Sequence, residues 1–110
     1  MKSVLVRSLI LFPALLVCAS GYAKLRVVVS TSQIADIVRN VGGEEVDLTV
    51  LMGPGVDPHL FKATARDVIS LQRADLILYN GLHLEGRLAE TFSKIDQRGH
   101  TVVAVAEAIP

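Results

Sequence analysis

The stretch VDLTVLMGPGVDPHLF, residues 46–61, passes from an apolar segment into a stiffened loop that carries a single histidine. Its first half is rich in β-branched and other apolar residues, as is typical of a strand buried in a sheet. In its second half, glycines permit sharp turns and two prolines fix φ, so the loop can hold His59 in one direction. A histidine that binds a metal ion or transfers a proton needs such preorganisation.

Apolar segments on both sides of this stretch predict three further strands. We expect strands at residues 25–29, 46–51, 75–79 and 101–105, because each segment is short, mostly apolar and rich in β-branched residues. Asn80-Gly81 would end the third of them.

Three helices are predicted between these strands. Apolar residues at helical spacing within 34–41 predict the first, and Gly42-Gly43 would end it. Residues 64–67 have the spacing of a capping box, with Asp in place of the usual Glu, and predict the start of the second. The third is expected over 84–95. The apolar sides of the first and third helices consist of Ile34, Ile37, Val38 and Val41, and of Leu84, Leu88, Phe92 and Ile95.

The alternation of strands and helices predicts an α/β fold. Nearly continuous apolar strands separated by amphipathic helices indicate a four-stranded parallel sheet with helices on both faces. In such a sheet, ligands bind outside the carboxyl ends of the strands. Residues that directly follow a strand are therefore the first candidates for a site.

This rule separates the three histidines. His59 follows the second strand and His83 follows the third, so both can reach the binding edge. His59 is the stronger candidate for a ligand of the two, whereas His83 is either a second ligand or a polar cap for the helix expected to begin near Leu84. His100 precedes the fourth strand and belongs at the opposite edge, as a solvated turn residue.

Two polar groups near the same edge have both a structural and a functional interpretation. Asp57 can accept a hydrogen bond from the second ring nitrogen of His59, or it can serve the turn beside Pro58. The cluster Ser30-Thr31-Ser32 can line a cleft, but capping of the following helix also accounts for it.

The first 23 residues have the pattern of a signal peptide. Lys2 and Arg7 supply positive charge, an apolar run follows, and Gly21-Tyr22-Ala23 offers small residues for cleavage after Ala23. The apolar run is too short and too interrupted to predict a transmembrane span. We therefore expect a secreted protein whose mature domain comprises residues 24–110.

Cys18 is the single cysteine, so no intramolecular disulfide is predicted. It is either a lipid-attachment site, which would anchor the chain to the membrane, or a residue removed with the signal peptide; Val17 before it favours removal. The 11 Lys/Arg and 11 Asp/Glu residues balance, and loss of Lys2 and Arg7 leaves a net charge of −2. That charge gives no reason to expect a nucleic-acid partner.

Two enzyme classes are excluded by their motifs. Gly53-Pro54-Gly55 is not a phosphate-binding loop, because the Lys-Ser/Thr that should follow is missing and Pro54 has no N–H to donate. A serine hydrolase elbow, Gly-x-Ser-x-Gly, is also absent from the sequence. Beside His59, no residue supplies a nucleophile or a second acid–base group, so we predict no enzyme.

Three stretches carry a family resemblance: VVSTSQI at 28–34, GPGVDPHLFKATA at 53–65, and ADLILYNGLHLE at 74–85. From about residue 25 to 110, the chain resembles the amino-terminal lobe of the metal-binding receptors of bacterial zinc and manganese ABC importers, most of all the TroA-like type. The resemblance implies that His59 is the first metal ligand, for Zn²⁺ or Mn²⁺, and that His83 is not a ligand. Many relatives carry a proline where Ala63 stands.

The resemblance also implies two lobes joined by a long helix, with the metal ion in the cleft between them and a permease as partner. Because the sequence stops after the fourth strand, we expect one lobe of such a receptor, truncated before its other ligands. A single imidazole would hold a metal ion weakly and with little selectivity. Two alternatives stay open: a fragment without independent activity, and a surface adhesin or other interaction module.

Overall fold

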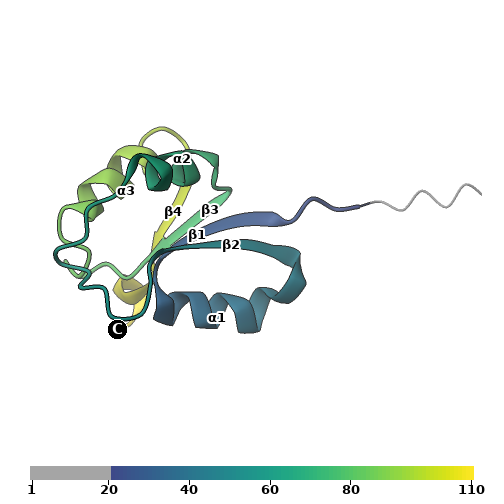
Figure 1. The fold of residues 1–110 in the computed structure, drawn as a ribbon, viewed down its shortest axis with the longest axis horizontal. Coiled ribbons are helices and arrows are strands. Elements are labelled where there is room, and N and C mark those ends of the chain that lie inside the picture. Colours follow the sequence, from purple (N-terminus) through teal and green to yellow (C-terminus); the bar gives the residue numbers. More distant parts are fainter. Residues whose placement is uncertain (1–20) are drawn as a thin grey trace, which may run out of the picture.

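The computed structural model describes residues 21–110, which form a four-stranded sheet flanked by helices (Figure 1). The elements are β1 (Leu25–Thr31), α1 (Ser32–Gly42), η1 (Gly43–Glu45), β2 (Val46–Met52), α2 (Ala65–Arg73), β3 (Leu76–Tyr79), α3 (Leu88–Asp96), β4 (Thr101–Ala104) and η2 (Val105–Ala108), where η is a 3₁₀-helix. All neighbouring strands are parallel, in the order β2-β1-β3-β4. The predicted α/β fold class with a four-stranded parallel sheet is confirmed.

The predicted signal peptide lies almost wholly outside the described residues, and so does Cys18. Only Gly21, Tyr22 and Ala23 of that segment are described, and they are exposed and irregular. Within residues 21–110, no helix is both long enough and apolar enough to cross a membrane.

The core has two layers, one on each face of the sheet, so the prediction of helices on both faces is confirmed. Helices α2 and α3 cover one face and α1 covers the other (Figure 1). The first layer is built from Val28, Leu51, Met52, Leu71, Ala74, Ile77, Leu88, Phe92 and Ile95, and the second from Val27, Val29, Ile34 and Ala35. Alternation along β1 explains this division, because successive side chains of a strand point to opposite faces.

Helix α1 turns only part of the predicted side to the sheet, including Ile34 and Val38. Ile34 and Ala35 are buried, but Ile37 and Val41 are 63% and 84% exposed. The small side chain of Ala35 lets the helix approach the sheet closely, so the positions beside it pack inward. Helical spacing of apolar residues identified the helix correctly and its buried side only in part.

Helix α3 begins four residues later than predicted. Gly86, which lies within the predicted helix, has a φ of 53°, and residues 81–83 before it have φ angles of 84°, 51° and 64°; a right-handed helix does not contain such angles. The segment from Gly81 to Arg87 is therefore a loop of turns. His83 lies within this loop and does not cap α3, so that interpretation of His83 was wrong.

The start of α2 follows the prediction in detail. Thr64 N donates to Asp67 Oδ2 at 2.8 Å and Asp67 N donates to Thr64 Oγ1 at 3.3 Å, which completes the capping box. Thr31 caps α1 by accepting from Ile34 N at 3.5 Å, so capping explains this member of the hydroxyl cluster.

A buried carboxylate joins the loop after β3 to the end of β1. Glu85 is fully buried, and its Oε1 accepts hydrogen bonds from Ser30 Oγ, at 2.8 Å, and from the backbone N–H of Asn80. Its Oε2 accepts from the backbone N–H of Gly81 at 3.1 Å. The strand order reverses between β1 and β3, so Glu85 fills the crevice in which α/β sheets usually hold a ligand.

An ion pair links β1 and β3 at the opposite end of the sheet. Arg26 Nη2 donates to Asp75 Oδ1 at 2.8 Å and Arg26 Nε donates to Asp75 Oδ2 at 3.1 Å. The backbone N–H of Arg26 also donates to Asp75 Oδ2, at 2.9 Å. The guanidinium of Arg26 lowers the pKa of Asp75 to about 2, with the backbone N–H of Arg26 as the next cause.

We predict that Asp75→Asn removes part of the acid dependence of stability. A carboxyl group whose pKa is lower in the folded chain stabilises the fold above its unfolded pKa of 3.8, and this contribution disappears as pH falls toward about 2. The variant should be less stable at pH 7 and lose less stability between about pH 4 and pH 2. Urea unfolding at a series of pH values measures both effects. Asp36→Asn on α1 is the control, and a variant profile parallel to that of the unmodified chain would contradict the prediction.

We predict that Glu85→Gln destabilises the domain by about 1–3 kcal/mol, because an amide donor would face N–H groups that need an acceptor. Urea unfolding at pH 7 measures the change. Glu90→Gln on the exposed side of α3 is the matched control and should change stability by less than about 0.5 kcal/mol. Equal effects of the two substitutions would show that Glu85 does not act as an anchor.

Candidate metal site

The loop that carries His59 leaves the carboxyl end of β2, at the edge where ligands bind in parallel sheets. Its first turn is closed by a hydrogen bond from Val56 N to Gly53 O at 3.3 Å. Gly55 has a φ of 81°, a conformation that favours glycine, so the sequence of the turn has a steric reason. The predicted strand-end position of His59 is confirmed, whereas its role as a ligand stays a prediction.

The carboxylate of Asp57 holds His59 in two ways. Asp57 Oδ1 accepts a hydrogen bond from the backbone N–H of His59 at 2.9 Å and lies 3.0 Å from His59 Nδ1. The first bond forms an Asx turn and the second orients the ring, so both interpretations of Asp57 hold. The backbone hydrogen bond, followed by the side-chain one, lowers the pKa of Asp57.

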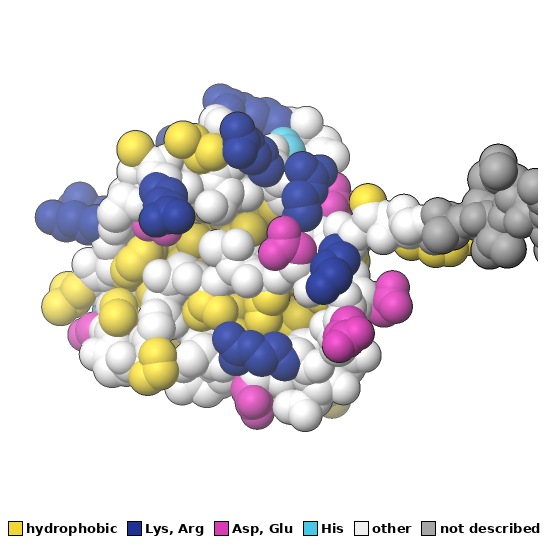
Figure 2. Space-filling model, turned by 45° about the vertical axis from the view of Figure 1, so that its right-hand side comes forward, with side chains coloured by type: hydrophobic (Ala, Val, Ile, Leu, Met, Phe, Trp, Pro, Cys, Tyr) yellow, Lys and Arg dark blue, Asp and Glu magenta, His cyan; other side chains and the backbone are white. Residues whose placement is uncertain are grey.

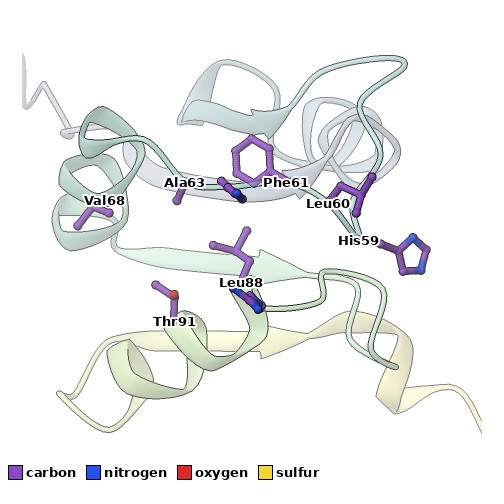
Figure 3. Close-up of a pocket in the computed structure, with 9 residues that line it drawn as sticks. His59, Leu60, Phe61, Ala63, Val68, Leu88 and Thr91 are labelled. Atoms are coloured by element: carbon purple, nitrogen blue, oxygen red, sulfur yellow. The ribbon is translucent and has the colours of Figure 1, made fainter.

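This pairing fixes which nitrogen of His59 can bind a cation. With a proton on Nδ1 that is donated to Asp57, the lone pair lies on Nε2. The side chain of His59 is 63% exposed, and the ring points away from the neighbouring cavity (Figure 3). His59 can therefore donate Nε2 to a metal ion that approaches from solvent.

Gly86 sets the position of the His59 backbone. A Cβ atom at residue 86 would lie 2.8 Å from the carbonyl oxygen of His59, which is closer than carbon and oxygen can pack. The loop after β2 thus rests on the loop after β3, at a point where only glycine fits. No role for Gly86 or Glu85 follows from the sequence alone, because their partners lie far away in the chain.

The other predicted polar residues do not join His59 in a site. His83 is exposed in the loop after β3, and His100 precedes β4 at the opposite end of the sheet, as predicted. Ser30 is buried against Glu85 and does not line a cleft. Within residues 21–110, no group of three or more His, Cys, Asp or Glu side chains could hold a metal ion.

A cavity of about 610 Å³ lies next to the His59 loop, between the starts of α2 and α3 (Figure 3). It is lined by His59, Leu60, Phe61, Lys62, Ala63, Val68, Arg87, Leu88 and Thr91. Lys62 and Arg87 would repel a metal cation, and no carboxylate contributes to the lining. A metal ion bound by His59 would therefore lie at the edge of the sheet and not in this cavity.

Known proteins with similar sequences are metal-binding proteins. The chain is 53% identical over 91 residues to the manganese-binding lipoprotein MntA of Bacillus subtilis. This aligned stretch covers 83% of this chain and 29% of MntA. It is 54% identical over 92 residues to the zinc-binding protein TroA of Treponema pallidum, covering 84% of this chain and 30% of TroA.

Solved structures support the same relationship. The periplasmic zinc-binding protein TroA from Treponema pallidum superposes with a TM-score of 0.76 and 56% identity, over 80% of this chain and 31% of that structure. The chain thus spans about 30% of the length of the relatives that it matches. The family described as ZnuA, zinc-uptake complex component A, periplasmic, matches residues 27–110. Together with the structural likeness to TroA, this match shows that the chain belongs to the ZnuA family.

Proposed function

We propose that residues 24–110 form the amino-terminal lobe of a receptor that captures Zn²⁺ or Mn²⁺ outside the cytoplasm for an ABC permease. The observation that carries the proposal is the His59–Asp57 pair, which directs a free imidazole nitrogen to solvent at the carboxyl edge of the sheet. Similar proteins support it, because they include a manganese-binding lipoprotein and a zinc-binding protein. Residues 1–23 would serve as the signal peptide; in the alternative, cleavage before Cys18 would leave that cysteine as the attachment point of a lipidated chain.

A neutral imidazole suits both proposed metal ions, since His nitrogen is a common ligand of zinc and also binds other divalent ions. A closed zinc site takes about four donors, and His59 supplies one. The other donors would come from water or from groups outside residues 21–110. Metal binding by the described lobe is therefore weak in this proposal, and it includes no catalytic step.

The geometry suits capture of a metal ion followed by its release. The ring of His59 is fixed by Asp57 and by the contact of its backbone with Gly86, so little ordering is needed when the metal binds. At the same time the ring is exposed, and groups from a second lobe or from water can complete or vacate the coordination sphere without disturbing the sheet.

We predict that His59→Ala abolishes the weak binding of Zn²⁺, because it removes the proposed ligand nitrogen. Isothermal titration of the 110-residue chain with Zn²⁺ and with Mn²⁺ measures the loss. Nitrogen-15 NMR of the imidazole groups should show the largest zinc-dependent shift at Nε2 of His59. His83→Ala and His100→Ala are the controls and should bind as the unmodified chain does. Zinc binding that survives His59→Ala would overturn the site assignment.

We predict that Asp57→Asn weakens zinc binding by about 10–100-fold while the loop keeps its turn. Asn retains an oxygen that can accept from the backbone N–H of His59, but it removes the charge that fixes the ring tautomer. Titration with Zn²⁺ measures the affinity, and urea unfolding checks that the fold persists. Unchanged affinity in a folded variant would show that Asp57 serves the turn alone.

A further inference from the structure

The outer side of α2 and α3 carries an excess of positive charge, and we call it the basic face. It comprises residues 62–73 and 87–98, with six cationic side chains and three acidic ones. The cations are Lys62, Arg66, Arg73, Arg87, Lys94 and Arg98, and the acids are Asp67, Glu90 and Asp96. On the opposite face of the sheet, residues 32–45 hold one cation and three acids. Figure 2 shows the contrast: Lys and Arg predominate over α2 and α3, and Asp and Glu below them, toward α1.

The cations of the basic face are exposed, and one of them, Arg73, lines a shallow cavity together with Asp47. All six side chains are exposed, and within residues 21–110 no salt bridge joins any of them to a carboxylate. Arg87, Lys94 and Arg98 recur at helical spacing along one side of α3 and the turn after it. Of the three acids, Asp67 accepts hydrogen bonds from the backbone N–H and the hydroxyl group of Thr64 in the capping box. The positive charge of this face is therefore available to a partner.

Apolar groups lie between the cations. On α2, Ile69 is 48% exposed and stands in the stripe formed by Arg66 and Arg73. The cavity beside the His59 loop is lined by Lys62, Arg87 and Thr91 around apolar side chains, so a phosphate that enters it meets two cations and a hydroxyl. Cations interspersed with exposed apolar groups suit the boundary between lipid headgroups and acyl chains.

We propose that the basic face rests on anionic phospholipid headgroups and thereby orients the domain on the membrane surface. The proposal depends on the extracytoplasmic location proposed above. With α2 and α3 against the membrane, the strands run along its surface and the carboxyl edge opens sideways. The ring of His59 points away from the cavity of the basic face, so it stays open to metal ions (Figure 3).

A membrane fits the distribution of charge better than an acidic protein segment does. The six cations are spread over two helices and their flanking turns. A membrane surface with many anionic headgroups can contact all of them at once. Similar proteins are named as lipoproteins, among them MntA of Bacillus subtilis and PsaA of Streptococcus pneumoniae. A chain held beside a membrane in that way needs only a weak attraction to settle in one orientation.

Vesicle binding of residues 24–110, the mature domain expected after removal of the signal peptide, tests the proposal. Co-sedimentation is measured with vesicles of phosphatidylcholine alone and with vesicles that also contain phosphatidylglycerol, at low and at high salt. A cation near an anionic surface contributes about fivefold to partitioning, so we expect Arg66→Glu/Lys94→Glu to lower binding to the anionic vesicles by at least about tenfold. The matched control, Lys24→Glu/Arg39→Glu, has the same net charge but leaves the basic face intact, and its binding should fall less than threefold.

Orientation is measured with single tryptophans, since the chain has none of its own. Ile69→Trp on α2 and Ile37→Trp on α1 both replace exposed side chains. A lipid with a spin-labelled headgroup should quench the fluorescence of the first more than that of the second. The proposal is overturned by equal quenching at both positions, by equal losses in the two charge-reversed pairs, or by binding that is independent of phosphatidylglycerol. His59→Ala should leave vesicle binding unchanged, so failure of the metal site and failure of the basic face are distinguishable.

Discussion

The hydrogen bonds of the buried Glu85 carboxylate join the carboxyl ends of the two central strands, β1 and β3. Glu85 accepts from Ser30 at the end of β1 and from the backbone of Asn80 and Gly81 at the end of β3. A buried carboxylate is costly unless donors surround it, and here three donors do. These bonds hold the two central strands of the sheet and the loop after β3 in one arrangement. The loop in turn supports the residues of the candidate metal site.

The loop after β3 needs this support because its backbone is strained. Leu82 and His83 both have positive φ, a conformation that costs a residue with a side chain about 1–2 kcal/mol. The hydrogen bonds to Glu85 offset that cost, and the resulting path brings Gly86 under the carbonyl group of His59. Strain of this kind persists where the surrounding structure fixes it, and often beside functional groups. The direction of the His59 ring thus depends on contacts made by a different loop.

Features that depend on neighbouring residues were predictable from the sequence. The four strands, the helix cap at Thr64 and the strand-end position of His59 follow from apolar runs, capping spacing and turn residues. The interaction of Asp57 with His59 also spans only two residues, and both of its forms were anticipated. The family resemblance was confirmed by the match over residues 27–110.

Features that depend on distant partners were not predictable. Leu84 fits the apolar spacing of α3, yet the loop excludes it from the helix, because Glu85 binds Ser30, 55 residues earlier in the chain. The exposure of Ile37 depends in the same way on how α1 lies on the sheet and not on its own spacing. The spacing of apolar residues shows which side of a helix is apolar, whereas packing against other elements determines which residues are buried.

The layered fold separates the edge that we propose to bind a metal ion from the face that we propose to contact a membrane. A parallel sheet places strand ends at one edge and helices on its faces, so His59 emerges at the edge and the cations of α2 and α3 lie on a face. The two surfaces meet only at the cavity, where Lys62 and Arg87 stand beside the loop of His59. Lys62 follows His59 by three residues, so contact of the basic face with headgroups would act next to the loop and leave the ring of His59 free. Because Asp57 and Gly86 fix the position of His59 from the side of the sheet, this contact need not change the direction in which Nε2 points.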